Sequence, residues 1–547
     1  MRRNVRGVLL CAGAGILAVM SAGNLGATPI DADGDSNHAT TIQELKALVL
    51  SQQKQIEELR TTLAKQQQTL DKLAAPAASP AATDYSLPNA KKLGEVATAT
   101  AMIPAGPGPQ KTELTNQPPT ETKAPLSWQL GDATFTPLGF MDFTSVWRST
   151  DIGTGIGTTF SAAPYNNTVL GRMPENHFST QNSRVGFKVD SEYHDMKIRG
   201  YLEADFLGNP AGSLAVTSNA NTMRMRLYWV DLTKSNIEFL AGQSWSMMTP
   251  NRKGISPMPG DIFYSQDMDT NYQNGLVWTR AAQVRVLYHG GDHFTWGFAA
   301  ENPEQYVGGG VVFPATLPAS FAPEFNAGSN TLATPNYAPD IQSKMAFDGK
   351  HAHLEIAGLF RSFHSFLPGT STTPAKTDTA IGAGGEINSN FEIVPGLRLI
   401  ENAYWSDGGG RYIGNTGAPD IIVRPDGSIS PVHSGSTVDG FEWTFGPHKQ
   451  SLLYAYYGGA FIRRNLAIDS AGKVSGYGVP GNGGANRSIQ EGTFGWVQTF
   501  WKNERLGDMK LITQYSYLWR YPWLVTGTNP RAAHSNMVWL DIRYDLP

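Results

Sequence analysis

Basic side chains recur at alternate positions in several short segments of this chain. Arg184 and Lys188 alternate with apolar residues, as do Lys197 and Arg199 in the segment that follows. Because alternate residues of a β-strand share a face, each segment would present its charges together. The basic residues with this pattern are Arg184, Lys188, Lys197, Arg199, Arg224, Arg226 and Arg285. Guanidinium and ammonium groups bind carboxylate and phosphate anions, so the pattern predicts anion binding.

Motifs for covalent or cofactor chemistry are absent from the sequence. It contains no phosphate-binding loop, no dinucleotide fingerprint and no nucleophile elbow. We therefore expect no enzymatic activity, no cofactor and no nucleic-acid partner. A lipase-like Ser/His/Asn site inside a β-barrel stays open as an alternative, because its residues need no fixed spacing.

The spacing of the strand-like segments indicates how the basic residues are positioned. From about residue 133 onward, sixteen segments show apolar–polar alternation. Every second connection is short, at 191–195, 234–236, 290–292, 348–350, 395–396, 447–449 and 503–507. Most of the others are long and rich in Gly, Pro and Asn, at 150–181, 249–274, 302–338, 407–436 and 463–487. Even-stranded outer-membrane barrels have this layout, with short periplasmic turns and long outer loops.

Composition supports a barrel whose outer surface contacts lipid. Charged residues make up 16% of the chain, below the roughly 25% of soluble domains. Mean hydropathy is −0.28, which suits a barrel with one polar face. A closed barrel also satisfies all backbone groups within lipid. We therefore predict an all-β fold, a sixteen-stranded antiparallel transmembrane β-barrel.

Inside such a barrel, the basic residues should face the lumen. Exposure of Lys or Arg to lipid at mid-depth costs about 2–4 kcal/mol, so these side chains are expected to form a cationic wall that concentrates anions. Asp190, Glu203 and Asp205 fall on the same predicted faces. The alternative is therefore a lumen in which these acids neutralise the bases.

The connection at 249–274 is the third predicted outer loop, which in sixteen-stranded porins folds inward and narrows the pore. It contains Asp261, Asp267 and Asp269. These acids could face the basic wall and create a field across the pore. Equally, they could lie on an exposed loop or at a subunit contact.

The segments that precede the barrel suggest export and a periplasmic arm. Residues 1–27 have the basic start and short apolar run of a secretory signal peptide. Residues 41–73 carry a heptad repeat typical of an α-helical coiled coil. Residues 74–127 form a linker rich in Pro and Ala, which should be extended. The barrel is expected over 128–547, with the coiled coil in the periplasm.

Several sequence stretches resemble DcaP-like porins. They are 181–187 (QNSRVGF), 198–208 (IRGYLEADFLG), 224–226 (RMR), 241–246 (AGQSWS) and 301–303 (ENP). The resemblance implies a homotrimeric, sixteen-stranded channel of the bacterial outer membrane that passes small anions such as dicarboxylates. Partners would then be small anionic or polar solutes and outer-membrane lipid. The alternative is a structural protein that tethers the outer membrane to the cell wall through its coiled coil.

Overall fold

The computed structural model of the chain describes residues 126–208, 221–262, 267–325, 338–371, 374–524 and 530–547. The expected signal peptide (1–27), the coiled coil (41–73) and all but the last two residues of the expected linker (74–127) lie outside the described residues. Among the described residues, no helix is long and apolar enough to cross a bilayer.

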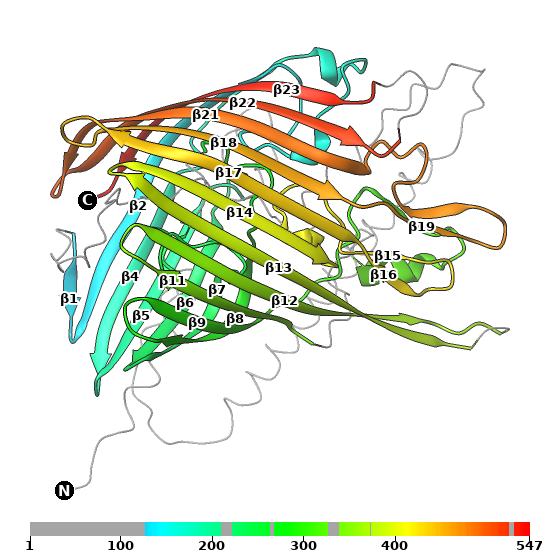
Figure 1. The fold of residues 1–547 in the computed structure, drawn as a ribbon, viewed down its shortest axis with the longest axis horizontal. Helices are drawn as coiled ribbons and strands as arrows, with labels where there is room; N and C mark the ends of the chain where they lie inside the picture. The colour runs from blue at the N-terminus through cyan, green and yellow to red at the C-terminus, as the bar shows by residue number, and fades with distance from the viewer. Residues whose placement is uncertain (1–125, 209–220, 263–266, 326–337, 372–373, 525–529) are drawn as a thin grey trace, which may run out of the picture. The chain divides into compact units, whose positions relative to one another are not determined.

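A closed antiparallel β-barrel with sixteen strand positions dominates the structure (Figure 1). In chain order, the first eight are β2 (Ala133–Arg148), β3 (Glu175–Ser179) with β4 (Arg184–Tyr193), β5 (Met196–Asp205), β6 (Arg224–Lys234), β7 (Ile237–Trp245), β8 (Arg280–His289), β9 (Phe294–Glu301) and β11 (Asp340–Asp348). The others are β12 (Ala352–Leu367), β13 (Lys376–Val394), β14 (Leu397–Asp407), β17 (His433–Phe445), β18 (Ser451–Ile462), β21 (Asn486–Asn503), β22 (Gly507–Pro522) and β23 (Ala533–Asp545). The predicted fold class of the barrel is confirmed.

Pairing between the first and last barrel strands closes the wall. β2 pairs with β23 from Phe140 opposite Asp545 to Arg148 opposite Met537. On its other edge, β2 pairs with β3 at one end and with β4 at the other. These two short strands therefore occupy one barrel position, and the predicted loop at 150–181 contains β3. A short strand, β1 (Trp128–Leu130), pairs with the start of β2.

Connections alternate between the two ends of the barrel as predicted. All seven short turns lie where the sequence placed them, and we call that rim the short-turn end. At the opposite rim, the long-loop end, the connections contain additional elements. These are the sheet of β10 (Val311–Val312), β19 (Asn465–Ile468) and β20 (Val474–Tyr477), the hairpin of β15 (Ile421–Val423) and β16 (Ile429–Pro431), and 3-10 helices η1 (Phe160–Ala162), η2 (Leu170–Arg172), η3 (Ala319–Phe325) and η4 (Gly410–Tyr412).

The two faces of the wall differ in chemistry. In β23, Val538, Leu540 and Ile542 point outward and are 42–48% exposed. On the other face of the strand, Asp541 and Arg543 point inward and are buried. Similar alternation in the other strands produces an apolar outer surface and a polar inner one, the arrangement expected of a barrel in lipid.

One predicted face is wrong. The alternation in β6 predicts that Leu227 and Trp229 lie on the outer face and Tyr228 on the inner one. Instead, Leu227 and Trp229 are 0% and 4% exposed, whereas Tyr228 is 55% exposed. The pairing of β5 with β6 shifts by one residue at Glu203. This β-bulge reverses the alternation beyond Arg226, as an extra residue in one strand must.

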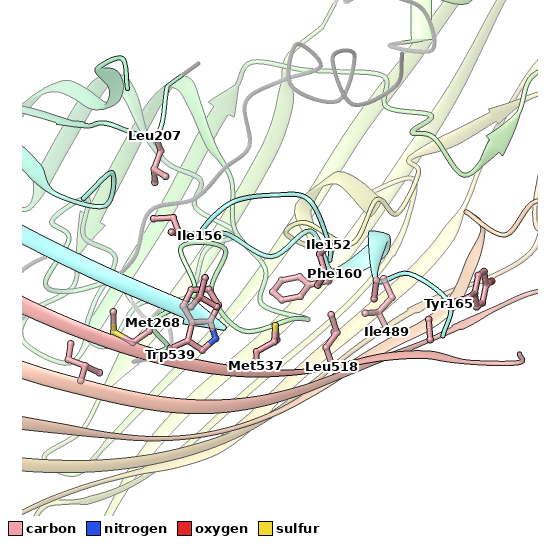
Figure 2. Close-up of a cluster of buried hydrophobic side chains, with 14 residues drawn as sticks. Ile152, Ile156, Phe160, Tyr165, Leu207, Met268, Ile489, Leu518, Met537 and Trp539 are labelled. Atoms are coloured by element: carbon pink, nitrogen blue, oxygen red, sulfur yellow. The ribbon is translucent and has the colours of Figure 1, made fainter. Parts of the chain in front are cut away.

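Apolar residues inside the barrel come from its loops as well as from its strands. Figure 2 shows Ile152, Ile156 and Phe160 of the β2–β3 connection beside Leu518 and Trp539 of the wall. Met268, from the β7–β8 connection, joins the same buried cluster. Two long loops therefore fold into the barrel, and their side chains occupy part of its interior.

Candidate functional site

Three of the predicted basic residues meet on adjacent strands. Arg224 donates hydrogen bonds of 3.0 and 2.7 Å to Asp205 of the neighbouring strand. Arg226 contacts Glu203 and donates a 3.0 Å hydrogen bond to Asp205. Arg184, from β4, lies 3.6 Å from Glu203. The structure therefore brings these arginines together on the inner face, where two carboxylates share them.

A fourth arginine, Arg280 at the start of β8, joins this group. Its guanidinium lies 5.6 Å from the ring centre of Trp245, and that of Arg226 lies 5.9 Å from the same ring. Sequence reasoning missed Arg280, although Thr279-Arg280 opens the strand that also carries Arg285. We call Arg184, Arg224, Arg226 and Arg280, with Glu203 and Asp205, the arginine cluster. Its four bases exceed its two acids by two charges.

Of the remaining predicted basic residues, three have carboxylate partners on the wall. Lys188 and Arg199 lie 3.2 and 2.6 Å from Asp190. Arg285 lies 3.8 Å from Glu238 of β7. These pairs match the alternative in which acids neutralise the basic residues of the wall.

Lys197 differs from the other predicted bases. It is exposed and pairs in register with Thr233 and Glu192 at the short-turn end. The structure records no ion pair within 4 Å for Lys197 among the described residues. It lies at the barrel rim, away from the arginine cluster.

The β7–β8 connection enters the lumen along one wall. Its Arg252 donates hydrogen bonds of 2.8 and 2.7 Å to Glu442 of β17. The backbone N–H of Asn251 donates to both oxygens of Glu355 in β12, at 3.1 Å each. Lys344 of β11 donates a 2.8 Å hydrogen bond to the carbonyl of Thr249. These contacts attach the incoming segment to strands β11, β12 and β17.

Residues 251–262 then form a closed loop inside the barrel. An antiparallel bridge joins Asn251 to Ile262, and the N–H of Arg252 donates a 2.6 Å hydrogen bond to the carbonyl of Asp261. Between these ends, Ile255 packs against Leu287 of β8 in a buried cluster that includes residues of β9 and β11. We call 251–262 the inner loop. It extends from the β17 wall to the β8–β11 wall.

The returning segment, from 267 onward, is attached to strands β18, β21 and β22. Gln514 of β22 donates a 2.5 Å hydrogen bond to Asp267. The N–H of Asn274 donates a 2.8 Å hydrogen bond to Glu491 of β21. Asp269 accepts a 3.0 Å hydrogen bond from the N–H of Thr158, in the β2–β3 connection. The two inward loops are therefore joined to each other as well as to the wall.

The three predicted acids of this connection have different environments. Asp267 and Asp269 are 0% exposed, so the expectation of an exposed loop or a subunit contact is wrong for both. Their partners belong to β22 and the β2–β3 connection, so they do not face the arginine cluster either. Asp261 accepts a 2.8 Å hydrogen bond from Ser256. The pKa of the Asp261 carboxyl is raised above its ordinary value by burial, and the positive charges of Lys253 and Arg199 oppose this rise only in part.

A second charged network fastens a long loop to the wall. Arg361 of β12 lies 2.9 Å from Asp340 and 2.8 Å from Asp420. Arg411 of η4 lies 2.8 Å from Asp340, which also accepts a 3.0 Å hydrogen bond from Tyr412. The sequence showed no pattern for this network, because its members come from one wall and one loop. All are nearly buried, so its role is to anchor the β14–β17 connection.

No group of three or more His, Cys, Asp or Glu residues in the described part of the chain is arranged to hold a metal ion. His353 lies 2.9 Å from Asp348, and His351 lies 3.3 Å from Glu392. These histidines therefore have carboxylate partners on the wall.

Comparisons with solved structures identify the fold. The chain is similar to the outer membrane channel DcaP of Acinetobacter baumannii, with a TM-score of 0.53 and 16% identity over 76% of this chain and 99% of that chain. An anion-selective porin from Comamonas acidovorans matches with a TM-score of 0.43 and 12% identity, over 76% and 100%. Salmonella typhi OmpF matches with a TM-score of 0.41 and 10% identity, over 77% and 100%. No protein-family model and no curated protein matches the chain. The resemblance to DcaP-like porins seen in the sequence is thus confirmed at the level of the fold.

Proposed function

We propose that this chain, a barrel with the fold of the DcaP channel, is a porin of the bacterial outer membrane that passes small hydrophilic solutes and favours anions such as dicarboxylates. The apolar outer face supports insertion in lipid, and the polar inner face supports passage of water-soluble molecules. The short-turn end would face the periplasm, as the short turns of outer-membrane barrels do.

The observation that carries the anion preference is the charge of the arginine cluster. Arg184, Arg224, Arg226 and Arg280 surround two carboxylates beside the returning segment of the β7–β8 connection. A surplus of two positive charges on the inner face of a barrel attracts anions and repels cations. A dicarboxylate carries two charges of the complementary sign.

We also propose that three copies assemble into a homotrimer, as the sequence resemblance implies. The mass of the detergent-solubilised full-length protein tests this, because a trimer and a monomer differ threefold in protein mass. A monomeric mass would contradict the trimer without affecting the channel itself.

Single-channel recording in a planar bilayer tests the channel function. We expect stepwise current increases after addition of the purified protein, with a preference for chloride over potassium. A second candidate function is a closed barrel that serves as the membrane anchor of a cell-wall tether. The observation that supports it is the packing of two loops inside the barrel. A closed anchor would insert without current steps.

A further inference from the structure

Arg398, on the inner face of β14 near the short-turn end, has no carboxylate in contact. Its guanidinium contacts the side-chain oxygen of Asn390, and its Nε is buried without a hydrogen-bond partner. Among the described residues, no carboxylate lies within ion-pair distance of it. The residue as a whole is half-buried. A partly desolvated guanidinium without a counter-ion costs free energy, so this position is suited to receive an anion.

The carboxylates nearest to Arg398 along the sheet are engaged elsewhere. Glu442 pairs in register with Arg398, but it accepts two hydrogen bonds from Arg252 and a 2.7 Å hydrogen bond from Tyr456. Glu392, opposite Arg398 on β13, accepts a 3.0 Å hydrogen bond from the N–H of Gly396 and lies 3.3 Å from His351. Their charges are therefore largely satisfied by other donors.

The inner loop brings two more bases to this place. Asn390, which contacts Arg398, also donates a 3.3 Å hydrogen bond to the backbone carbonyl of Arg252. The next residue, Lys253, is exposed and has no ion pair within 4 Å among the described residues. Gly254 follows and donates a 3.0 Å hydrogen bond to Asp348 at the rim. Contacts on both sides of Lys253 thus hold its backbone against the wall.

Two further acids face this region. Asp348 lies 2.9 Å from His353 and accepts the hydrogen bond from Gly254. Asp261 accepts a hydrogen bond from Ser256, and burial raises the pKa of its carboxyl above the ordinary value of 3.8. Both acids therefore have donors of their own, and neither lies within ion-pair distance of Lys253 or Arg398.

We propose that Arg398 and Lys253, with Arg252 beside them, form a binding site for small carboxylate anions at the short-turn end of the lumen. The site rests on the proposed channel function and lies apart from the arginine cluster. A planar guanidinium can bind a carboxylate through two parallel hydrogen bonds, and the flexible ammonium group of Lys253 adds a second point of attachment. Arg252 stays bound to Glu442 and contributes its charge at longer range.

Block of the chloride current by malonate, a small dicarboxylate, tests the site in the full-length protein. Malonate is added to the side of the bilayer that the short turns face, and the half-blocking concentration is measured. Arg398→Gln and Lys253→Gln should each raise the half-blocking concentration of malonate by roughly 10-fold, which is the effect of losing one charge-assisted hydrogen bond. Arg505→Gln and Lys449→Gln, exposed changes of the same types in two short turns, should leave it unchanged.

The possible results separate the site from the channel function. The site is contradicted if the unmodified channel prefers anions but is not blocked by malonate. It is also contradicted if Lys253→Gln and Lys449→Gln have the same half-blocking concentration. Neither result contradicts the channel function. A protein without current steps contradicts the channel function itself. Because Lys253 is exposed on a loop, its substitution does not threaten folding, so Lys253→Gln decides the matter even if Arg398→Gln fails to assemble.

Discussion

The guanidinium of Arg252 donates two hydrogen bonds to the carboxylate of Glu442, which lies 190 residues later in the chain. This bidentate pair joins the inner loop to strand β17. Glu442 is nearly buried, with its side chain 5% exposed. The pair is one of the contacts that hold the inner loop in the lumen.

We expect Arg252→Ala to release the inner loop from the wall, because a nearly buried carboxylate would lose its main partner, at a cost of about 2–3 kcal/mol. Single-channel conductance and current noise should both increase. Lys376→Ala, which removes an exposed ion pair with Asp426, is the matched control. Equal noise in the two variants would show that the pair does not hold the loop.

Gly458 of β18 touches the returning segment so closely that no side chain fits. A Cβ atom at this position would lie 1.8 Å from the carbonyl oxygen of Asn274. We expect Gly458→Ala to push that segment off the wall, with an overpacking cost of about 1–3 kcal/mol and a higher conductance. Gly492→Ala, where no atom lies within 4 Å of the new Cβ, is the control. Equal heat resistance of the two variants on a gel would contradict the close contact.

Asp267 should make the stability of the folded barrel depend on pH. Burial and the neighbouring Asp269 raise the pKa of Asp267 to about 7, from an ordinary value of 3.8. Between these values the folded state binds the proton more tightly than the unfolded state does, so the free energy of unfolding falls as pH rises.

Melting of the detergent-solubilised protein at several pH values measures this effect. The difference in melting temperature between the unmodified protein and Asp267→Asn should change steadily between about pH 4 and pH 7, since the amide cannot titrate. A constant difference over that range would mean that Asp267 ionises normally. Because Gln514 still contacts the amide side chain, the variant preserves the shape of the site.

Arg280→Gln should weaken the anion preference. It removes one of the two surplus charges of the arginine cluster and leaves the ion pairs of Arg224 and Arg226 in place. The zero-current potential in a KCl gradient should shift toward the value for potassium. Arg505→Gln, an exposed change in a short turn, is expected to cause no shift. If both variants behave like the unmodified protein, the cluster does not control selectivity.

Strand order, turns and most faces could be predicted because they depend on local sequence. Alternation over ten residues places Arg184 opposite the acidic end of β5, and a two-residue turn such as 235–236 is visible as a break in that alternation. The bulge beside Glu203 adds a single residue to one strand. No local pattern marks it, so the faces of Leu227 and Trp229 were assigned wrongly.

The interior of the barrel was harder to predict, because its contacts join distant segments. Asp269 meets Thr158 across 111 residues, and Asp267 meets Gln514 across 247. The residues next to each acid in the sequence show only that it lies in a long, polar loop. Which wall it contacts depends on how two loops pack inside the barrel, and that is determined by the fold as a whole.

The zero-current potential of the unmodified, full-length protein in a KCl gradient shows whether the barrel is an anion-preferring channel. The measurement needs no knowledge of the natural solute, and it reports the sign of the charge that controls the pore. We expect current steps and a potential displaced toward that of chloride, because four arginines face two carboxylates in the arginine cluster. A potential displaced toward potassium, or insertion without current, would contradict it.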